Sequence, residues 1–98
     1  MKPGSLIKFN PVYLEFDHST GEYHPLVHFW REIPYPQSDL HLRNRFPDLM
    51  MNHKELCILL EKDQDHGGEW WCKILTQNGT IGWMRRKLMI TVEVRGCT

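Results

Sequence analysis

The segment from residue 70 to residue 85 constrains the fold of this chain more than any other part of the sequence. Asn78 and Gly79 form a strong short-range hairpin signal, because both residue types tolerate a positive φ. Residues 70–76 are rich in aromatic and aliphatic side chains, and residues 81–85 can return as the partner strand. We therefore predict an antiparallel hairpin with its tip at Asn78-Gly79.

The register of this hairpin is open between two alternatives. A two-residue loop places Ile74 opposite Trp83, whereas a three-residue loop places Ile74 opposite Gly82. In either register, adjacent side chains of a strand point to opposite faces. Trp70 and Trp71 therefore cannot both lie in a core, and we expect one of them to be exposed and to act as an interface anchor.

Further short segments with strand character flank the hairpin. An apolar run indicates a strand from about Glu55 to Lys62, residues 5–9 indicate a first strand and residues 89–94 a last one. Between the hairpin and the last strand, residues 86–88 are long enough for one helical turn. Short strands joined by tight turns predict a mainly β fold, and the length suits one domain, residues 1–98.

The middle of the chain, residues 10–54, is the least regular part. Residues 12–16 alternate between apolar and polar side chains, which predicts a strand. Turn-forming residues occupy 17–22, so a return strand over residues 26–31 would complete a hairpin arm. Pro25 would hold that return strand to a sheet edge.

Helical signals also occur in this middle region. Ser38 and Asp39 can cap a short helical segment that Pro47 ends. Residues 48–60 fit both a helical face and a buried strand. We favour a helical turn through Met51, followed by the strand that begins at about Glu55.

Several stretches taken together resemble the Src-homology-3 (SH3) barrel. The stretches are Glu55-Leu56-Cys57-Ile58-Leu59-Leu60, Trp70-Trp71-Cys72-Lys73-Ile74-Leu75, Asn78-Gly79-Thr80-Ile81-Gly82-Trp83-Met84 and Leu88-Met89. The match covers roughly residues 55–94 and looks closest to bacterial and phage-encoded members. The resemblance implies a five-stranded barrel in which residues 2–9 supply the first strand and residues 10–54 form an inserted hairpin arm and short helical segment. It also implies that Ile74 and Met84 share the core face.

The same resemblance implies a binding site, a shallow groove lined by the exposed tryptophan of the pair Trp70 and Trp71, beside Arg85 and Leu88. Peptide-binding members of the family have a proline where this chain has Arg85 and a tyrosine where it has Leu88. Only the tryptophan pair remains of the proline-binding groove, so PxxP peptides are not the expected ligand. Nearby acidic residues favour a partner that carries Lys or Arg; they are Asp63, Asp65 and Glu69.

The charge balance argues against two classes of function. Lys and Arg together number 12, and so do Asp and Glu, which gives a net charge of zero. Proteins that bind nucleic acids or anionic membranes depend on excess positive charge. The longest apolar run, residues 56–60, is far too short to cross a membrane.

The sequence contains none of the motifs that carry catalysis. No serine has the context of a nucleophile elbow, no cysteine has an evident histidine partner, and no glycine-rich phosphate loop precedes a helix. His24 and His28 would lie about 13 Å apart on a strand, too far to share one ion. The run from Asp63 to Asp65 begins like a calcium loop, but Ile74 occupies the position of its closing acid. We therefore expect a protein that is not an enzyme and that needs no metal or cofactor.

The three cysteines indicate the compartment. An odd number of cysteines without an N-terminal signal peptide argues against a disulfide framework and predicts a reducing, cytoplasmic location. Cys57 and Cys72 lie in apolar stretches, where burial is expected, whereas Cys97 is expected to be exposed. The phage resemblance adds a virion as the alternative location.

These observations lead to two hypotheses about function. The first is a non-catalytic protein–protein interaction or assembly module, whose partner is another protein or a second copy bound through the arm at residues 12–31. The alternative is a nucleic-acid-binding small barrel. In that alternative Trp70, Trp71 and Tyr35 would stack on bases, and the basic residues Arg85, Arg86 and Lys87 would contact phosphates.

Overall fold

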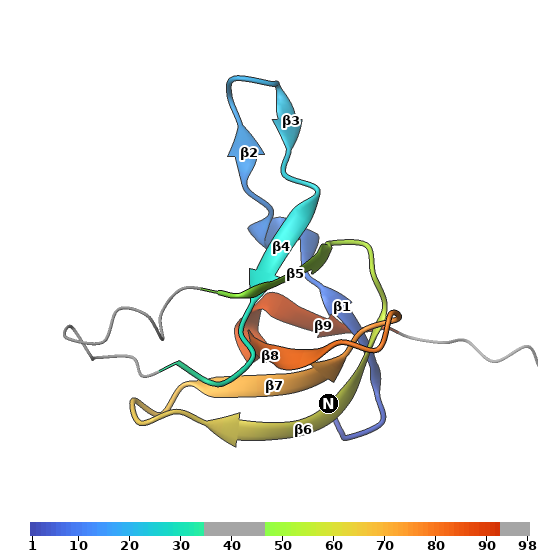
Figure 1. Ribbon diagram of the computed structural model, residues 1–98, viewed down its shortest axis with the longest axis vertical. Coiled ribbons are helices and arrows are strands. Elements are labelled where there is room, and N and C mark those ends of the chain that lie inside the picture. The colour runs from blue at the N-terminus through green and yellow to red at the C-terminus, as the bar shows by residue number, and fades with distance from the viewer. Residues whose placement is uncertain (35–46, 93–98) are drawn as a thin grey trace, which may run out of the picture.

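The computed structural model describes residues 1–34 and 47–92, and this part of the chain is mainly β, as the sequence predicts (Figure 1). The strands are β1 (Leu6–Phe9), β2 (Phe16–Asp17), β3 (Glu22–Tyr23), β4 (Leu26–Phe29), β5 (Leu49–Asn52), β6 (Cys57–Gln64), β7 (Trp70–Leu75), β8 (Ile81–Arg85) and β9 (Met89–Thr91). Two short 3-10 turns, η1 (Pro11–Tyr13) and η3 (Arg86–Leu88), complete the described elements.

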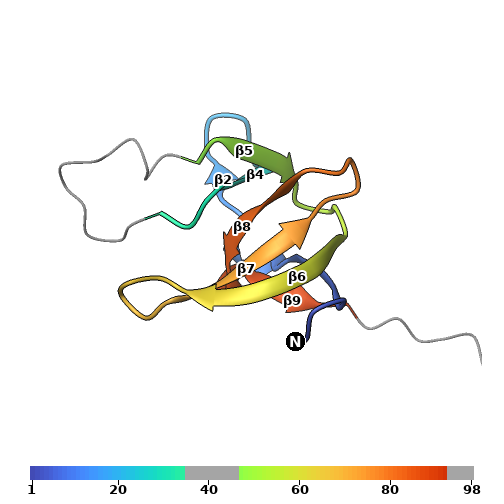
Figure 2. The ribbon, with the colours of Figure 1, turned by 60° about the horizontal axis from the view of Figure 1, so that its bottom comes forward.

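Five strands form the main sheet, in the order β8-β7-β6-β1-β9, and every neighbouring pair is antiparallel. The long strand β6 pairs with β1 at its start and with β7 along the rest of its length. Its register shifts between Leu59 and Glu61, where a bulge lets the strand bend (Figure 2). In the described part of the chain no ladder joins β8 to β9, so the sheet is not closed into the predicted barrel.

The hairpin between β7 and β8 has the predicted tip, and its loop is the three-residue alternative. Ile74 pairs with Gly82, and Thr76 N donates to Thr80 O at 2.9 Å. Gly79 has a φ of 88°, the left-handed conformation that this loop needs and that glycine adopts without strain. Ile74 and Met84 are both buried, which confirms that they share the core face.

Strands β4 and β5 form a two-stranded antiparallel sheet that packs over the core. Trp30, just after β4, forms an isolated bridge to Trp83 of β8, with Trp30 N donating to Trp83 O at 3.0 Å. This bridge links the β4–β5 sheet to the β8 edge of the main sheet. The predicted helical turn through Met51 is wrong. Met51 lies on a strand opposite Val27, and both side chains are buried.

The predicted strand over residues 12–16 and its pairing with residues 26–31 are also wrong. Pro11 opens the 3-10 turn η1, and the Asn10 side chain caps it by accepting a hydrogen bond from Val12 N at 3.1 Å. The alternation of residues 12–16 is therefore no sign of a buried face, since Val12 is 80% exposed. Strand β4 takes β5 as its partner instead, because that pairing buries apolar side chains from both strands.

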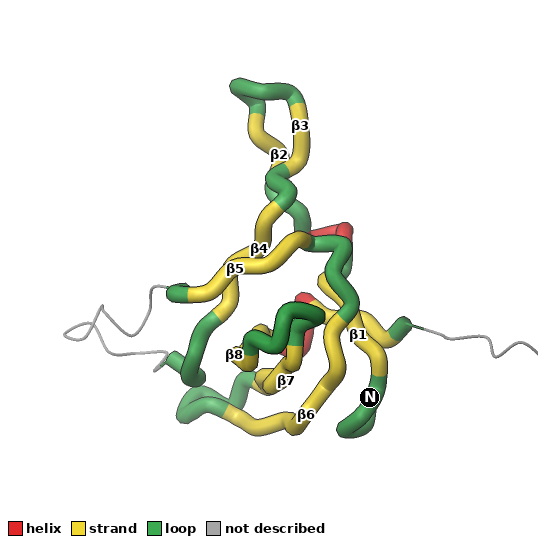
Figure 3. Tube along the Cα trace, turned by 45° about the vertical axis from the view of Figure 1, so that its right-hand side comes forward, coloured by secondary structure: helices red, strands yellow, loops and turns green. Residues whose placement is uncertain are grey.

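A narrow arm projects from the body of the molecule (Figures 1 and 3). It consists of β2 and β3, paired through Phe16 with Tyr23 and through Asp17 with Glu22. The turn predicted over residues 17–22 is confirmed. Asp17 accepts hydrogen bonds from the amide and hydroxyl of Ser19, at 2.9 and 2.6 Å.

The C-terminal elements of the main sheet agree in part with the prediction. The helical turn predicted at residues 86–88 is present as η3, and β9 follows it directly. Four predictions fall on residues outside the described part of the chain. They are the stacking role of Tyr35, the helical segment capped by Ser38 and Asp39, the end of the last strand at residues 93–94, and the exposure of Cys97.

One apolar core joins the main sheet to the β4–β5 pair. Its buried side chains are Ile7, Phe9, Val27, Phe29, Met51, Cys57, Leu59, Cys72, Ile74, Met84 and Met89. The predicted burial of Cys57 and Cys72 is confirmed. Burial, with a smaller contribution from the Glu55 carboxylate, raises the pKa of Cys57 to about 12. These thiols therefore remain protonated at neutral pH and pack as small apolar groups.

Gly82 marks the closest approach within this core. A Cβ atom at this position would lie 2.5 Å from two ring carbons of Phe29 and 2.7 Å from Leu49 Cδ1. Because Gly82 has no side chain, the Phe29 ring of β4 can lie directly against β8 at this position.

Among the described residues, no helix has the length and apolarity needed to span a membrane.

Candidate protein-contact surfaces

The two tryptophans at the start of β7 occupy different environments. Trp71 is only 1% exposed, whereas Trp70 is 47% exposed, which confirms that one ring of the pair faces solvent. The Trp71 ring meets the Trp30 ring edge to face, with centroids 5.3 Å apart and an interplanar angle of 88°. Trp71 is therefore a packing residue, and only Trp70 offers its ring to a ligand.

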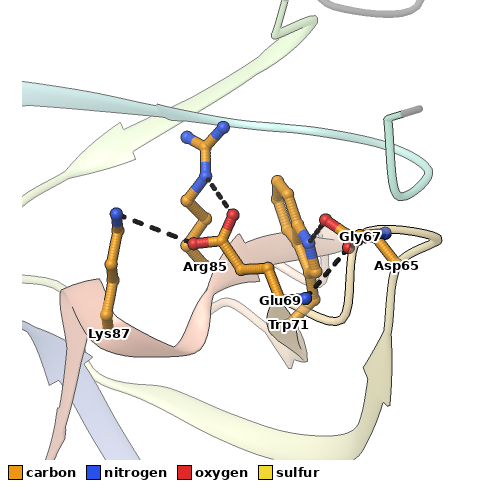
Figure 4. A network of polar contacts seen from close by, with 6 residues as sticks. All are labelled: Asp65, Gly67, Glu69, Trp71, Arg85 and Lys87. Carbon is orange, nitrogen blue, oxygen red and sulfur yellow. Dashed lines mark hydrogen bonds and ion pairs between the residues drawn. The ribbon is translucent and has the colours of Figure 1, made fainter. Parts of the chain in front are cut away.

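Arg85 lies over the two tryptophan rings, Trp30 and Trp71, that meet where the end of β4 approaches the main sheet. Its guanidinium carbon lies 5.0 Å from the centroid of the Trp71 ring and 5.3 Å from that of Trp30, which are cation–π distances. Arg85 Nε also donates to Glu69 Oε1 at 3.2 Å, and Lys87 Nζ lies 3.6 Å from Glu69 Oε2 (Figure 4). The Arg85 charge is thus neutralised within the chain.

Asp65 holds the β6–β7 loop against Trp71. The Trp71 indole donates to Asp65 Oδ2 at 2.9 Å, and the amides of Gly67 and Glu69 donate to Oδ1 at 2.8 and 3.0 Å (Figure 4). Partial desolvation raises the pKa of Asp65, but these hydrogen bonds and the Arg85 charge outweigh it and lower the pKa below its ordinary value. The ionised carboxylate therefore stabilises the loop.

This arrangement concerns two of the three acids, Asp63, Asp65 and Glu69, that were expected to favour a basic partner. Asp65 and Glu69 were expected to attract Lys or Arg of another protein, but both contact residues of this chain. The exposed ring of Trp70 instead shares a hollow of about 310 Å³ with Lys62 and Arg86. Within residues 1–34 and 47–92, neither cation forms a salt bridge. The surface beside Trp70 is therefore basic.

The site residues predicted from the sequence do not form one groove. Trp71 and Arg85 are paired across β7 and β8 and contact each other. Trp70 lines the hollow with Lys62, which was not predicted to accompany it, and with Arg86, which was named beside it only in the nucleic-acid alternative. Leu88 is half-buried against the core and lines a different cavity, of about 520 Å³, at the base of the arm.

The arm carries a second candidate surface. Five of the large exposed apolar side chains lie on or beside it: Val12, Tyr13, Phe16, Tyr23 and Leu26. The Phe16 ring meets those of Tyr23 and His18 edge to face, each at a centroid distance of 5.1 Å. The aromatic side chains of the arm thus contact one another and are still open to solvent.

The described residues show no arrangement typical of a metal site. No group of three His, Cys, Asp or Glu side chains gathers within residues 1–34 and 47–92 in a way that could hold an ion. His53 instead contacts the backbone, with its Nδ1 atom 3.1 Å from Pro25 O.

Comparisons with protein families, curated proteins and solved structures found no match for this chain. Sequence reasoning identified the tryptophan pair, and it named Arg86 with Trp70 only in the nucleic-acid alternative, but it missed Lys62 as a neighbour of Trp70. The register of the β6–β7 hairpin, with Gln64 opposite Trp70, brings Lys62 close to Trp70 and could have identified it as a neighbour. That register depends on the length of the loop between β6 and β7. The acidic residues that begin at Asp63 do not determine this length.

Proposed function

We propose that this protein is a non-catalytic protein–protein interaction or assembly module on an SH3-like scaffold. The arm of β2 and β3 carries this proposal. A two-stranded hairpin is at best marginally stable alone in water. Contiguous exposed apolar side chains on a folded protein are typical of contact sites. A partner that covers Phe16 and Tyr23 accounts for both features.

The scaffold part of the proposal draws support from topology. The order β8-β7-β6-β1-β9, a one-turn helix between β8 and β9, and a long insertion between β1 and β6 suit the five-strand plan of the SH3 family. The insertion departs from that plan in size. Its β4–β5 half covers the sheet, and its β2–β3 half is the arm, so this chain presents a contact surface where peptide-binding members have a loop.

The test is a double substitution in the arm, Phe16→Ala with Tyr23→Ala. We expect it to weaken association at least 100-fold, because exposed aromatic anchors contribute about 2 kcal/mol each to binding. Association would be measured by light scattering for self-association and by cross-linking and affinity capture for other proteins. The matched control is Ile58→Ala with Ile81→Ala, which removes two exposed apolar side chains of the main sheet.

Three results would overturn the proposal. The first is association, with self or with another protein, that the arm variant leaves unchanged. The second is no association at all, and the third is turnover of a substrate in a broad hydrolase panel that a single point substitution abolishes.

A further inference from the structure

We propose that the hollow formed by Lys62, Trp70 and Arg86, the Trp70 hollow, binds the arm of a second copy of this chain, so that copies associate head to tail. This inference rests on the proposed function and names the partner and the contact surface.

The Trp70 hollow has the chemistry of a receptor for an acidic, aromatic segment. It combines a half-exposed indole ring with two cations, and neither cation is neutralised within the described residues. The adjacent cations Arg85 and Lys87 differ, because both contact Glu69. Lys62 lies opposite Cys72 in the β6–β7 ladder, two positions along β7 from Trp70, and Arg86 lines the same hollow.

The arm has the complementary chemistry. The stretch from residue 9 to residue 30 contains no Lys or Arg, and its acids are Glu15, Asp17 and Glu22. The hydroxyl and the amide of Ser19 donate to Asp17 and lower its pKa, so this carboxylate is ionised at neutral pH. Phe16 and Tyr23 place two aromatic rings among these charges.

The pairing within the arm points to an external cation. Asp17 and Glu22 lie directly opposite each other in the β2–β3 ladder. Like charges at such a position destabilise a hairpin, and this hairpin has only two residue pairs to hold it. Cations of a bound partner would relieve the repulsion, and the Trp70 hollow supplies two of them.

The positions of the two surfaces determine the mode of association. The arm stands at one end of the molecule and the β6–β7 hairpin, which carries Lys62 and Trp70, at the other (Figures 1 and 3). The arm therefore reaches the hollow of another copy and not its own. Contacts between two different surfaces of one chain build open chains or rings, whereas arm-to-arm contact would bring acidic surfaces together.

A charge-reversal pair tests the contact. One variant, Lys62→Glu with Arg86→Glu, reverses the hollow, and the other, Glu15→Lys with Glu22→Lys, reverses the arm while Asp17 keeps its turn contacts. We expect each variant alone to associate at least 100-fold more weakly than the wild type. An equimolar mixture should recover association, because each reversed surface meets its complement. Sedimentation velocity measures both.

Two further variants sharpen the test. Trp70→Ala should weaken association about 30-fold, the equivalent of about 2 kcal/mol, with an unchanged melting temperature. The control Lys8→Glu with Lys54→Glu makes the same change in net charge on β1 and in the β5–β6 turn, and should associate like the wild type.

Two outcomes would overturn the inference that the arm binds the Trp70 hollow of a second copy. Absence of self-association up to about 1 mM protein would do so, and so would reversed variants that remain dissociated when mixed. If the arm captures a different protein in either case, the proposed function stands and only the head-to-tail contact fails. Salt-dependent binding of a single-stranded oligonucleotide that is lost in Trp70→Ala, without self-association, would assign the hollow to nucleic acid instead.

Discussion

The insertion between β1 and β6 contains two small sheets with different properties. The β4–β5 pair places Val27, Phe29 and Met51 in the core and bridges to β8 through Trp30. The β2–β3 pair has no buried residue, and its aromatic side chains face solvent.

This difference separates, within one insertion, a strand pair that packs into the core from a strand pair that is exposed. Side chains of β4 and β5 fill space against the main sheet, so their removal should cost folding free energy. Side chains of the arm contact mainly one another, so their removal should leave folding nearly unchanged. The following predictions measure this contrast.

The largest expected effect is at Phe29. Phe29→Ala should lower the free energy of unfolding by about 3–5 kcal/mol, because it removes a fully buried ring and leaves a cavity. The matched substitution in the arm, Phe16→Ala, should change it by less than about 0.5 kcal/mol. Urea denaturation of both variants measures the two values, and equal losses would mean that the arm is part of the folded core.

A smaller effect is expected at the seam between β4 and β8. Gly82→Ala places a methyl group against the Phe29 ring and should destabilise the protein by about 1–3 kcal/mol through overpacking. The double variant Gly82→Ala with Phe29→Leu, which has a smaller side chain at the contact, should be less destabilised than the sum of its single changes. Strict additivity in a double-mutant cycle would contradict the contact.

The smallest effect is expected at Asp65, and it depends on pH. Asp65→Asn removes the charge that accepts hydrogen bonds from Trp71 and two amides, and should cost about 1 kcal/mol at pH 7. The pKa of Asp65 is lowered in the folded state, so its contribution is complete above the ordinary value of 3.8 and is lost as pH falls through the lowered pKa. The two proteins should therefore converge in stability at strongly acidic pH. Thermal unfolding across this range, with Asp63→Asn as control, checks the convergence.

Local signals in the sequence predicted part of the fold well. Asn78-Gly79 determines a turn by its own backbone preferences, and alternation alone requires one of Trp70 and Trp71 to be exposed. The strand β5 was missed because its residues Leu49–Asn52 lack β-branched or aromatic side chains. Its conformation comes from pairing with β4, a long-range interaction that no local pattern reports.

The candidate site was harder to predict, because its charges depend on contacts. Asp65 and Glu69 lie five residues and one residue before Trp70 in the sequence. The fold directs them to Trp71, Arg85 and Lys87 instead. An Asp two residues before a Gly in a loop is typical of a side chain that caps its own turn, and this signal could have identified Asp65 as structural. The approach of Trp30 to Trp71 has no such signal.

The place of β1 in the sheet has a consequence for how the chain folds. β1 lies between β6 and β9, and Ile7 pairs with Cys57 on one side and Thr91 on the other. Strands β6, β7 and β8 are joined by short turns, so we expect them to assemble first and β1 to join late, after a long loop closes. The entropy of that closure grows only with the logarithm of loop length, about 0.6 kcal/mol for each doubling. The arm can therefore lengthen, shorten or change its sequence during evolution at little cost to the sheet, which leaves the contact surface that we propose for it free to diverge.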